Sequence, residues 1–396
     1  MDIFNPDHDL CLANGSSSFV PPATARQFGQ DCSAIMEYVL PDVSPHKVWG
    51  WDRIVLGRLL KSGADPSQLP SEAYLDTVRE LSHRRYALSC REYVFSKIGN
   101  PGFLCDIAPY EAMTMDSIIS TVNEYADALL KAPWSGSGKG IRKVRPDSWT
   151  ASDRGWCAKM LDRQGSVMVE RRQKVALDFS LQFRMTADRL LFEGFAIFET
   201  QGCAYNANLL ASNGHILGLL SAYSETKDIL RVRDLVGEYL ETAFLGRYRG
   251  VLGVDMFFSE EGLLAPCIEI NVRNNMGMVS RLVYDRLASE YAGGFCAGAS
   301  GRAGAGASVC AGASGRAGAG ASVCTDASAR AGAGASVCAG TSGRSGAGLS
   351  AGFPDGQLKM RVLNASSPEQ LRSSLAGART ILAGGGPDAL HAVAIF

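Results

Sequence analysis

The sequence predicts an α/β or α+β chain of two or three compact units. Strand-like and helix-like segments alternate up to about residue 295, which favours a mixed chain over an all-α or all-β one. The chain has 396 residues and 46% apolar content, enough to bury a core in units of about 100 to 200 residues. Two strand-like runs, GVLGVDMFF and LLAPCIEINV, flank a turn at 259–262 and predict a hairpin.

The elements are expected in the following order. A short strand, MDIF, opens the chain, and the helical stretch SHRRYALSCREYVFSKIG stops at the GNPG run at 99–102. Val144 and Pro146 fit a strand better than a helix, so the chain reads strand, glycine loop, strand around residue 137. The remaining expected elements are the helices MDSIISTVNEYADA and ASDRGWCAKMLDRQ, the strands ALLKAPW, IRKVRP, SVMVERRQ, LDFSLQFRMT, RLLFEGFAIFET, KMRVLN and HAVAIF, and the helix SPEQLRSSLAGARTIL.

Charge and composition exclude several classes of function. The formal net charge is −1 and no basic block is present, which argues against nucleic acid as the main partner. No apolar stretch approaches the roughly 20 residues of a membrane helix. The early residues include Asp2, Asp7 and Asp9 instead of a basic, apolar leader. The 11 cysteines form no close CxxC pair, so we expect reduced thiols in a cytoplasmic protein. Because the apolar stretches are short, we expect no membrane partner.

Residues 296–351 repeat the pattern CAGASGRAGAGASV with small drift. Such a segment has little to bury, so we expect a disordered insertion. The alternative, a solenoid, needs a periodic apolar face that Ala, Val and Cys alone hardly provide. The expected units are 1–80, 81–163, 164–292, the repeat region 293–352, and 353–396.

A glycine loop with one central lysine predicts a phosphate site. Glycine backbone can approach an anion closely, and an ammonium group neutralises its charge. It is no P-loop, because Pro133 and Gly140 occupy positions where that motif has Gly and Ser or Thr. The alternative is a flexible hairpin tip with an incidental lysine. The loop comprises Ser135, Gly136, Ser137, Gly138, Lys139 and Gly140.

Lys131 strengthens the phosphate interpretation. It lies within an apolar strand, where a lysine is costly unless its charge has a partner, and a nucleotide phosphate would be one. The alternative is an edge-strand lysine whose ammonium reaches solvent.

The expected hairpin carries a candidate magnesium site. Asp255 and Glu269 interrupt its two apolar strands at the same end, and two such carboxylates repel unless a cation joins them. Asn271 shares a face with Glu269 and completes an oxygen-rich set suited to Mg²⁺. Arg273 follows on that face as a fixed cation, and the alternative for it is a structural salt bridge with one acid at a surface sheet.

Taken in order, Lys131, the glycine loop, the VMVE strand, Asp255 and the EINVR run resemble the ATP-grasp superfamily over roughly residues 80–290. EINVR is most similar to the form seen in biotin carboxylase and carbamoyl phosphate synthetase. The resemblance implies an ATP-grasp fold, with two α+β subdomains (81–163 and 164–292) sandwiching ATP. Residues 1–80 would be a small α/β pre-ATP-grasp domain, and 353–396 would complete the larger subdomain.

The resemblance also implies roles for individual residues. Lys131 and Lys139 would bind phosphate, Glu170 would meet the adenine amine, and Asp178 would bind the ribose. The backbone from Arg171 to Gln173 would line the adenine ring. Asp255, Glu269 and Asn271 would bind Mg²⁺, with Arg273 stabilising the developing anion. Arg84 or Arg85 takes the place of a lysine found in many members. Asn5, Asp7 and His8 could reach substrate, but a turn of solvated polar residues is favoured.

Three functions remain open at this point. The leading one is a ligase that joins a small-molecule carboxylate to an amine through an acylphosphate, using ATP and Mg²⁺. A small-molecule kinase would use the same nucleotide site, and a nucleotide-binding module would bind without turnover.

Overall fold

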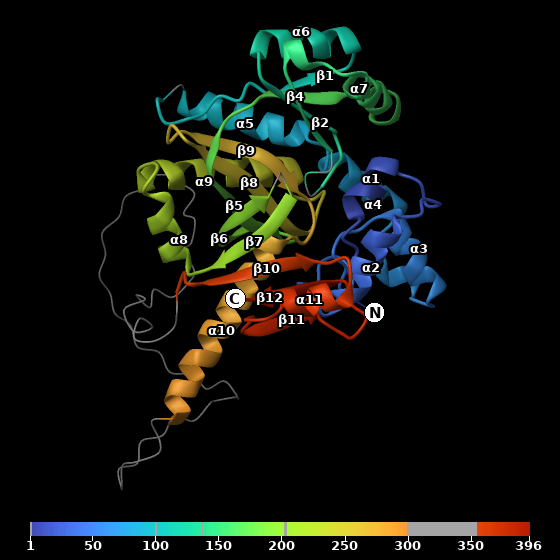
Figure 1. Cartoon of the computed structure of the whole chain (residues 1–396), viewed down its shortest axis with the longest axis vertical. Helices are drawn as coiled ribbons and strands as arrows, with labels where there is room; N and C mark the ends of the chain where they lie inside the picture. Colours follow the sequence, from blue (N-terminus) through green and yellow to red (C-terminus); the bar gives the residue numbers. More distant parts are fainter. Residues whose placement is uncertain (1, 100, 137, 139, 202–203, 299–354) are drawn as a thin grey trace, which may run out of the picture. The chain divides into compact units, whose positions relative to one another are not determined.

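The computed structural model describes residues 2–99, 101–136, 138, 140–201, 204–298 and 355–396 (Figure 1). The chain divides into two compact units, Met1–Arg286 with Pro354–Phe396, and Leu287–Phe353. In the described part of the chain, no helix is long and apolar enough to cross a membrane. The repeat lies outside the described residues from position 299 onward.

The N-terminal region of the first unit is mainly helical. The expected opening strand is reduced to one parallel bridge between Ile3 and Val48, because Asn5 and Pro6 turn the chain at once. Asp52 caps the third helix by accepting hydrogen bonds from the backbone of Ile54 and Val55. The helices are α1 (His8–Asn14), α2 (Ala23–Asp31), η1 (Ser33–Tyr38), α3 (Arg53–Lys61), η2 (Pro66–Gln68) and α4 (Glu72–Leu81).

A small antiparallel sheet follows, with strand order β1-β4-β2-β3. Its strands pack an apolar core against α6 and α7, which both begin with a capping box, at Thr114 and Thr150. The elements of this part are α5 (Arg85–Ile98), β1 (Tyr110–Ala112), α6 (Met115–Tyr125), β2 (Ala128–Lys131), β3 (Ile141–Val144), η3 (Pro146–Ser148), α7 (Ala151–Gln164) and β4 (Val167–Arg171).

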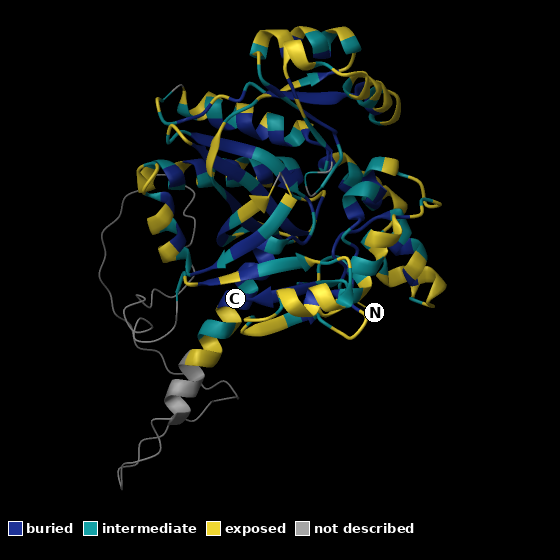
Figure 2. Ribbon diagram, in the orientation of Figure 1, coloured by how far each residue is buried: buried dark blue, intermediate teal, exposed yellow. Residues whose placement is uncertain are grey.

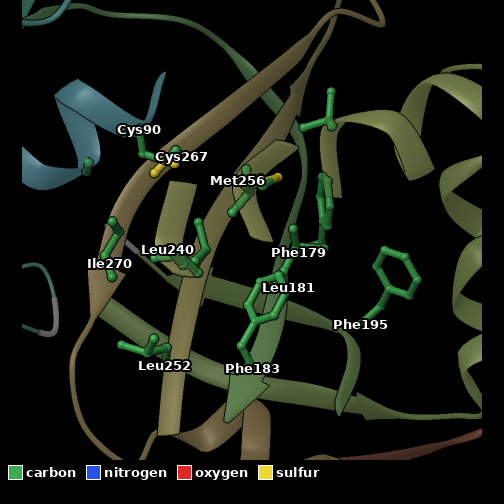
Figure 3. Close-up of a cluster of buried hydrophobic side chains, with 14 of the residues drawn as sticks. Cys90, Phe179, Leu181, Phe183, Phe195, Leu240, Leu252, Met256, Cys267 and Ile270 are labelled. Carbon is green, nitrogen blue, oxygen red and sulfur yellow. The ribbon is translucent and has the colours of Figure 1, made fainter. Parts of the chain in front are cut away.

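An eight-stranded sheet of order β11-β12-β10-β7-β6-β5-β8-β9 forms the centre of the unit. One face packs the main core, where Phe179 and Leu181 lie near Leu240 of α9 (Figure 3). The other face carries the polar side chains described below. The bounds are β5 (Val175–Met185), β6 (Leu190–Gln201), β7 (Ala204–Leu210), α8 (Asn213–Leu220), α9 (Thr226–Phe244), β8 (Gly250–Ser259), β9 (Leu264–Asn271) and α10 (Met276–Gly298).

The segment after the repeat adds three strands to the same sheet, because β10 (Leu358–Asn364) pairs with β7. The helix expected over 367–382 is correct only in its first half. α11 (Pro368–Ser374) ends before Gly377, whose φ of 90° suits a turn, and β11 (Thr380–Gly384) then pairs with β12 (His391–Ile395). Figure 2 shows α11 largely exposed and the central strands largely buried.

Candidate active site

A cavity of about 700 Å³ lies within the first unit. The register of the large sheet sets its floor, because residues paired across antiparallel strands point to the same face. Asp255 pairs with Glu269 on one side and with Ser180 on the other. Farther along, Asp178 pairs with Phe198, and Phe198 pairs with Asn208. All of these residues line the cavity, together with residues of the small sheet and of the N-terminal region.

The two hairpin carboxylates face each other across adjacent strands, as the sequence indicated. Burial, together with the nearby Glu269, raises the pKa of Asp255 to about 7, and Arg273 and a hydrogen bond from Asn271 oppose the rise. That bond joins Asn271 Nδ2 to Asp255 Oδ2 at 3.1 Å. The two carboxylates therefore lie together at the place where the sequence predicts a cation.

Arg84 joins Glu269 to the glycine loop. Its Nη1 lies 3.0 Å from Glu269 Oε2, and its side chain is 5% exposed. Its Nε donates to the carbonyl of Ala132 at 3.0 Å, and its Nη2 donates to the carbonyl of Ser135 at 3.1 Å. The planar guanidinium thus fixes β9 against the loop, a role that an ammonium group could not fill in the same way.

Lys131 has the charged partner that its buried position requires. Its Nζ lies 2.5 Å from Glu170 Oε2, and the two side chains are 5% and 8% exposed. β2 is an interior strand between β4 and β3, so the alternative of an edge-strand lysine reaching solvent is wrong. Glu170 was expected to meet an adenine amine, and here one of its oxygens is occupied by Lys131. Both residues line the cavity.

The described part of the glycine loop connects β2 and β3. Gly138 lines the cavity and has a φ of 71°, where a side chain would be strained. Gly136 approaches Asp9 so closely that a Cβ would lie 2.0 Å from its Oδ2. Gly140 accepts a hydrogen bond from the Ala132 backbone at 2.9 Å and closes the loop. Ser137 and Lys139 lie outside the described residues.

The residues expected at the adenine and ribose also line the cavity: Glu170, Arg171, Gln173 and Asp178. Burial raises the pKa of Asp178, and a hydrogen bond from Thr200 Oγ1, 3.2 Å from Asp178 Oδ2, partly offsets this. Thr200 and Lys143 line the same space, although sequence reasoning did not single them out.

Arg273 is paired with an acid that the sequence did not point to. Its Nε and Nη2 lie 3.1 and 2.9 Å from the two carboxylate oxygens of Asp9. Burial alone would raise the pKa of Asp9, and Arg273 holds it below its usual value. The alternative of a salt bridge with one hairpin acid at a surface sheet does not describe this pair, because the partner is Asp9 and both residues line the cavity.

The expectation of a solvated turn around Asn5, Asp7 and His8 is wrong. Their exposed fractions are 2%, 8% and 1%. His8 Nδ1 and Asn5 Nδ2 lie 3.1 and 3.0 Å from Asp52 Oδ2, so a buried network holds the segment that delivers Asp9. The sequence offered one signal for this burial, which is that apolar residues flank the NPDHD run. Polar residues that are buried between apolar ones need hydrogen-bond partners inside the protein.

The residues at the hairpin fit a magnesium ion that is shared with substrate. The described part of the chain holds no group of three or more His, Cys, Asp or Glu side chains arranged for a metal. Mg²⁺ commonly uses only one or two carboxylates and takes its other ligands from water and phosphate. Asp255 and Glu269 meet that requirement, because their two carboxylates pair across adjacent strands.

No family model and no curated protein match the sequence. The fold is similar to solved structures. One is an N5-carboxyaminoimidazole synthetase from Staphylococcus aureus complexed with ADP, with 14% identity over 51% of this chain and 50% of that one, at a TM-score of 0.36. Another is the ATP complex of carboxyaminoimidazole ribonucleotide synthase from Aspergillus clavatus, with 11% identity, 86% and 73% coverage, and a TM-score of 0.41.

A biotin carboxylase from Campylobacter jejuni is also similar, with 12% identity, 60% and 57% coverage, and a TM-score of 0.39. These are likenesses in fold, with identities of 11 to 14% and TM-scores of 0.36 to 0.41. The match spans half of the Staphylococcus chain, and identities this low describe the fold alone. What this chain does is therefore inferred from its own site.

Proposed function

We propose that this protein is an ATP-dependent ligase that joins a small-molecule carboxylate to an amine through an acylphosphate. The observation that carries the proposal is the pair of opposed carboxylates, Asp255 and Glu269, on the floor of a cavity that also holds Lys131 and Arg273. A cavity that holds two carboxylates and two cationic side chains fits a polyanionic substrate that binds together with a metal cation. Mg–ATP is that substrate.

In this proposal Asp255, Glu269 and Asn271 hold Mg²⁺, which would screen the charge of the phosphates. Arg84 Nη1 lies 3.0 Å from Oε2 of Glu269, and the cation would bind the other carboxylate oxygen, Oε1. Asn271 turns its amide nitrogen toward Asp255 in the structure, and a rotation of the amide would present its oxygen instead.

The nucleotide would lie between the small sheet and the large one. Glu170 to Gln173 would line the adenine, and Asp178 with Thr200 would accept and donate hydrogen bonds at the ribose. The phosphates would lie near Lys131 and the glycine loop, which comprises Ser135, Gly136, Ser137, Gly138, Lys139 and Gly140. Lys131 would then exchange part of its contact with Glu170 for a phosphate oxygen.

Arg273 and Lys139 would stabilise charge during phosphoryl transfer. The γ-phosphoryl group passes from ATP to an oxygen of the carboxylate, and ADP leaves. The amine then attacks the carbonyl carbon, phosphate leaves, and the amine nitrogen loses a proton. Arg273 is fixed by both oxygens of Asp9, so it needs no reorganisation as charge develops.

The first test is ADP release from Mg–ATP in the presence of a panel of carboxylic acids and amines, followed by trapping with hydroxylamine. An acylphosphate is an electrophile, so we expect a hydroxamate that forms only with ATP, Mg²⁺ and the acid. A stable phosphate ester without hydroxamate would favour the small-molecule kinase, which shares the nucleotide site. Nucleotide binding with no ADP release from any pair would favour a binding module.

A further inference from the structure

Aromatic rings from three distant parts of the chain gather in one part of the cavity. Phe4 meets Trp49 at a centroid distance of 5.0 Å and Phe28 at 5.4 Å, both edge to face. Phe28 in turn lies 5.1 Å from the ring of His391. All four line the cavity, and we call them the aromatic end. Rings that pack edge to face with one another still have faces and edges that a further aromatic ring can contact.

The aromatic end is continuous with the metal-site strand. Asn274, which follows Arg273, donates its backbone N–H to the carbonyl of Trp49 at 2.9 Å. On the side formed by the C-terminal strands, His391 of β12 pairs with Asn364 of β10, and Asn364 also lines the cavity. A ligand in the aromatic end therefore shares one space with the phosphate site.

The charge of the cavity differs between its two parts. In the described residues, the cationic side chains that line it are Lys131, Lys143, Arg171 and Arg273, which belong to the small sheet or adjoin the metal strand. The aromatic end contributes no Lys or Arg. It is suited to a neutral aromatic group and poorly suited to a second phosphate.

A carboxylate fixes the imidazole at this end. Asp31 Oδ2 lies 2.8 Å from His391 Nδ1 and also accepts the backbone N–H groups of Leu390 and His391, at 2.9 and 3.1 Å. Because a carboxylate only accepts, Nδ1 carries the hydrogen, and when the imidazole is neutral its Nε2 is an acceptor. The side chains of His391 and Asp31 are 13% and 6% exposed, so the ring is held in one orientation.

We propose that the aromatic end binds the non-reacting part of the amine substrate, and that this part is an aromatic ring bearing an N–H or O–H donor. The ring packs among Phe4, Phe28 and Trp49, and its donor bonds to His391 Nε2. Asp31 is a positioning residue that sets the tautomer. This inference rests on the proposed ligase function, since it assigns the acceptor of that reaction.

The experiment measures binding of four amines by calorimetry, to the full chain with and without saturating Mg–ADP. Ethylamine lacks a ring, phenethylamine adds one, and tyramine and tryptamine add a donor to the ring. We expect phenethylamine to bind at least about tenfold more tightly than ethylamine, because its ring is buried. Tyramine or tryptamine should gain about three- to tenfold more, the usual net worth of one hydrogen bond.

Two variants separate the contributions. Phe28→Ala should weaken all three aromatic amines about tenfold. His391→Leu should remove the advantage of tyramine and tryptamine over phenethylamine while leaving phenethylamine itself little changed. Tyr110→Ala, at a ring that is 44% exposed and outside the cavity, is the matched control and should change none of these affinities.

The outcomes also separate this inference from the ligase proposal. If Mg–ADP binds but no amine shows an aromatic preference, the inference is overturned and the ligase proposal stands. If Phe28→Ala weakens Mg–ADP as much as it weakens the amines, the aromatic end holds adenine, which also overturns it. If the amines behave as expected while neither Mg–ADP nor Mg–ATP binds, the aromatic subsite stands and the ligase proposal fails.

Discussion

Asp255 carries an electrostatic cost that a cation would remove. Burial and Glu269 raise its pKa from 3.8 to about 7. The folded state therefore holds a proton that the unfolded state has released, and stability falls as pH rises from about 4 to about 7. Below that window both states are protonated, and the penalty is absent. A bound cation reverses the effect, because it favours the ionised carboxylate.

We expect Asp255→Asn to remove this dependence. In metal-free buffer, the melting temperature of the wild type should fall relative to the variant between pH 5 and pH 8. Asp188→Asn, at an exposed turn, is the control and should follow the wild type. If the melting temperatures of the wild type and of Asp255→Asn change in parallel with pH, Asp255 ionises in the folded protein without an electrostatic penalty, and the prediction is wrong.

The contact between β2 and β4 contains a second electrostatic dependence. Lys131 and Glu170 are almost fully buried and 2.5 Å apart. Removing one partner leaves an uncompensated buried charge, whereas removing both removes the need for compensation. Other residues of the two strands belong to an apolar core.

We predict that Lys131→Met costs about 3 to 5 kcal/mol in urea unfolding, and that Lys131→Met with Glu170→Gln costs clearly less than the sum of the single changes. Lys227→Met, which breaks an exposed pair with Glu225, should leave stability almost unchanged. Additive single and double changes would mean that the two charges are separately solvated.

Local pattern predicted the elements around the site well. The β8–β9 hairpin with Asp255 opposite Glu269 follows from alternation and a turn signal, and β2 with Lys131 follows from an apolar run. The short helix α11 was harder, because SPEQLRSSLAGARTIL keeps helical spacing beyond Gly377 and only pairing with β12 makes its end a strand.

Long-range contacts could not be predicted from the same pattern. Arg84 meets Glu269, and Asp9 meets Arg273, across most of the chain. A charged residue in sequence shows that it needs a partner when it is buried, but not which partner the tertiary fold supplies. For that reason the sequence alone favours a solvated turn at Asn5, Asp7 and His8, whereas the structure buries all three and brings the adjacent Asp9 to the cavity.

At the scale of the whole molecule, the chain leaves the first unit in α10 and re-enters it at β10, which pairs with β7. The repeat separates two segments of one sheet. Loop-closure entropy grows slowly with loop length, so the length of the segment has little effect on stability. The expected domain boundaries and the disorder of the repeat stay predictions.

We expect that replacing residues 296–351 with a short Gly/Ser linker changes the melting temperature and the ADP-forming activity little. A chain with the repeat scrambled at constant composition is the control for length. A large loss in the short-linker chain alone would indicate that length matters, and a loss in both would show that the repeat sequence is folded or functional.

The most direct test of the central claim is the Mg²⁺ dependence of ATP binding in Glu269→Gln. Calorimetry with and without Mg²⁺ should show that the ion strengthens ATP binding to the wild type, and that Glu269→Gln loses most of this gain and at least about a hundredfold of turnover. Glu260→Gln, at the exposed turn of the same hairpin, should behave as wild type. Full retention of the Mg²⁺ gain, or near-normal ADP formation at saturating Mg²⁺, by Glu269→Gln would contradict the assignment of β9 as the metal strand.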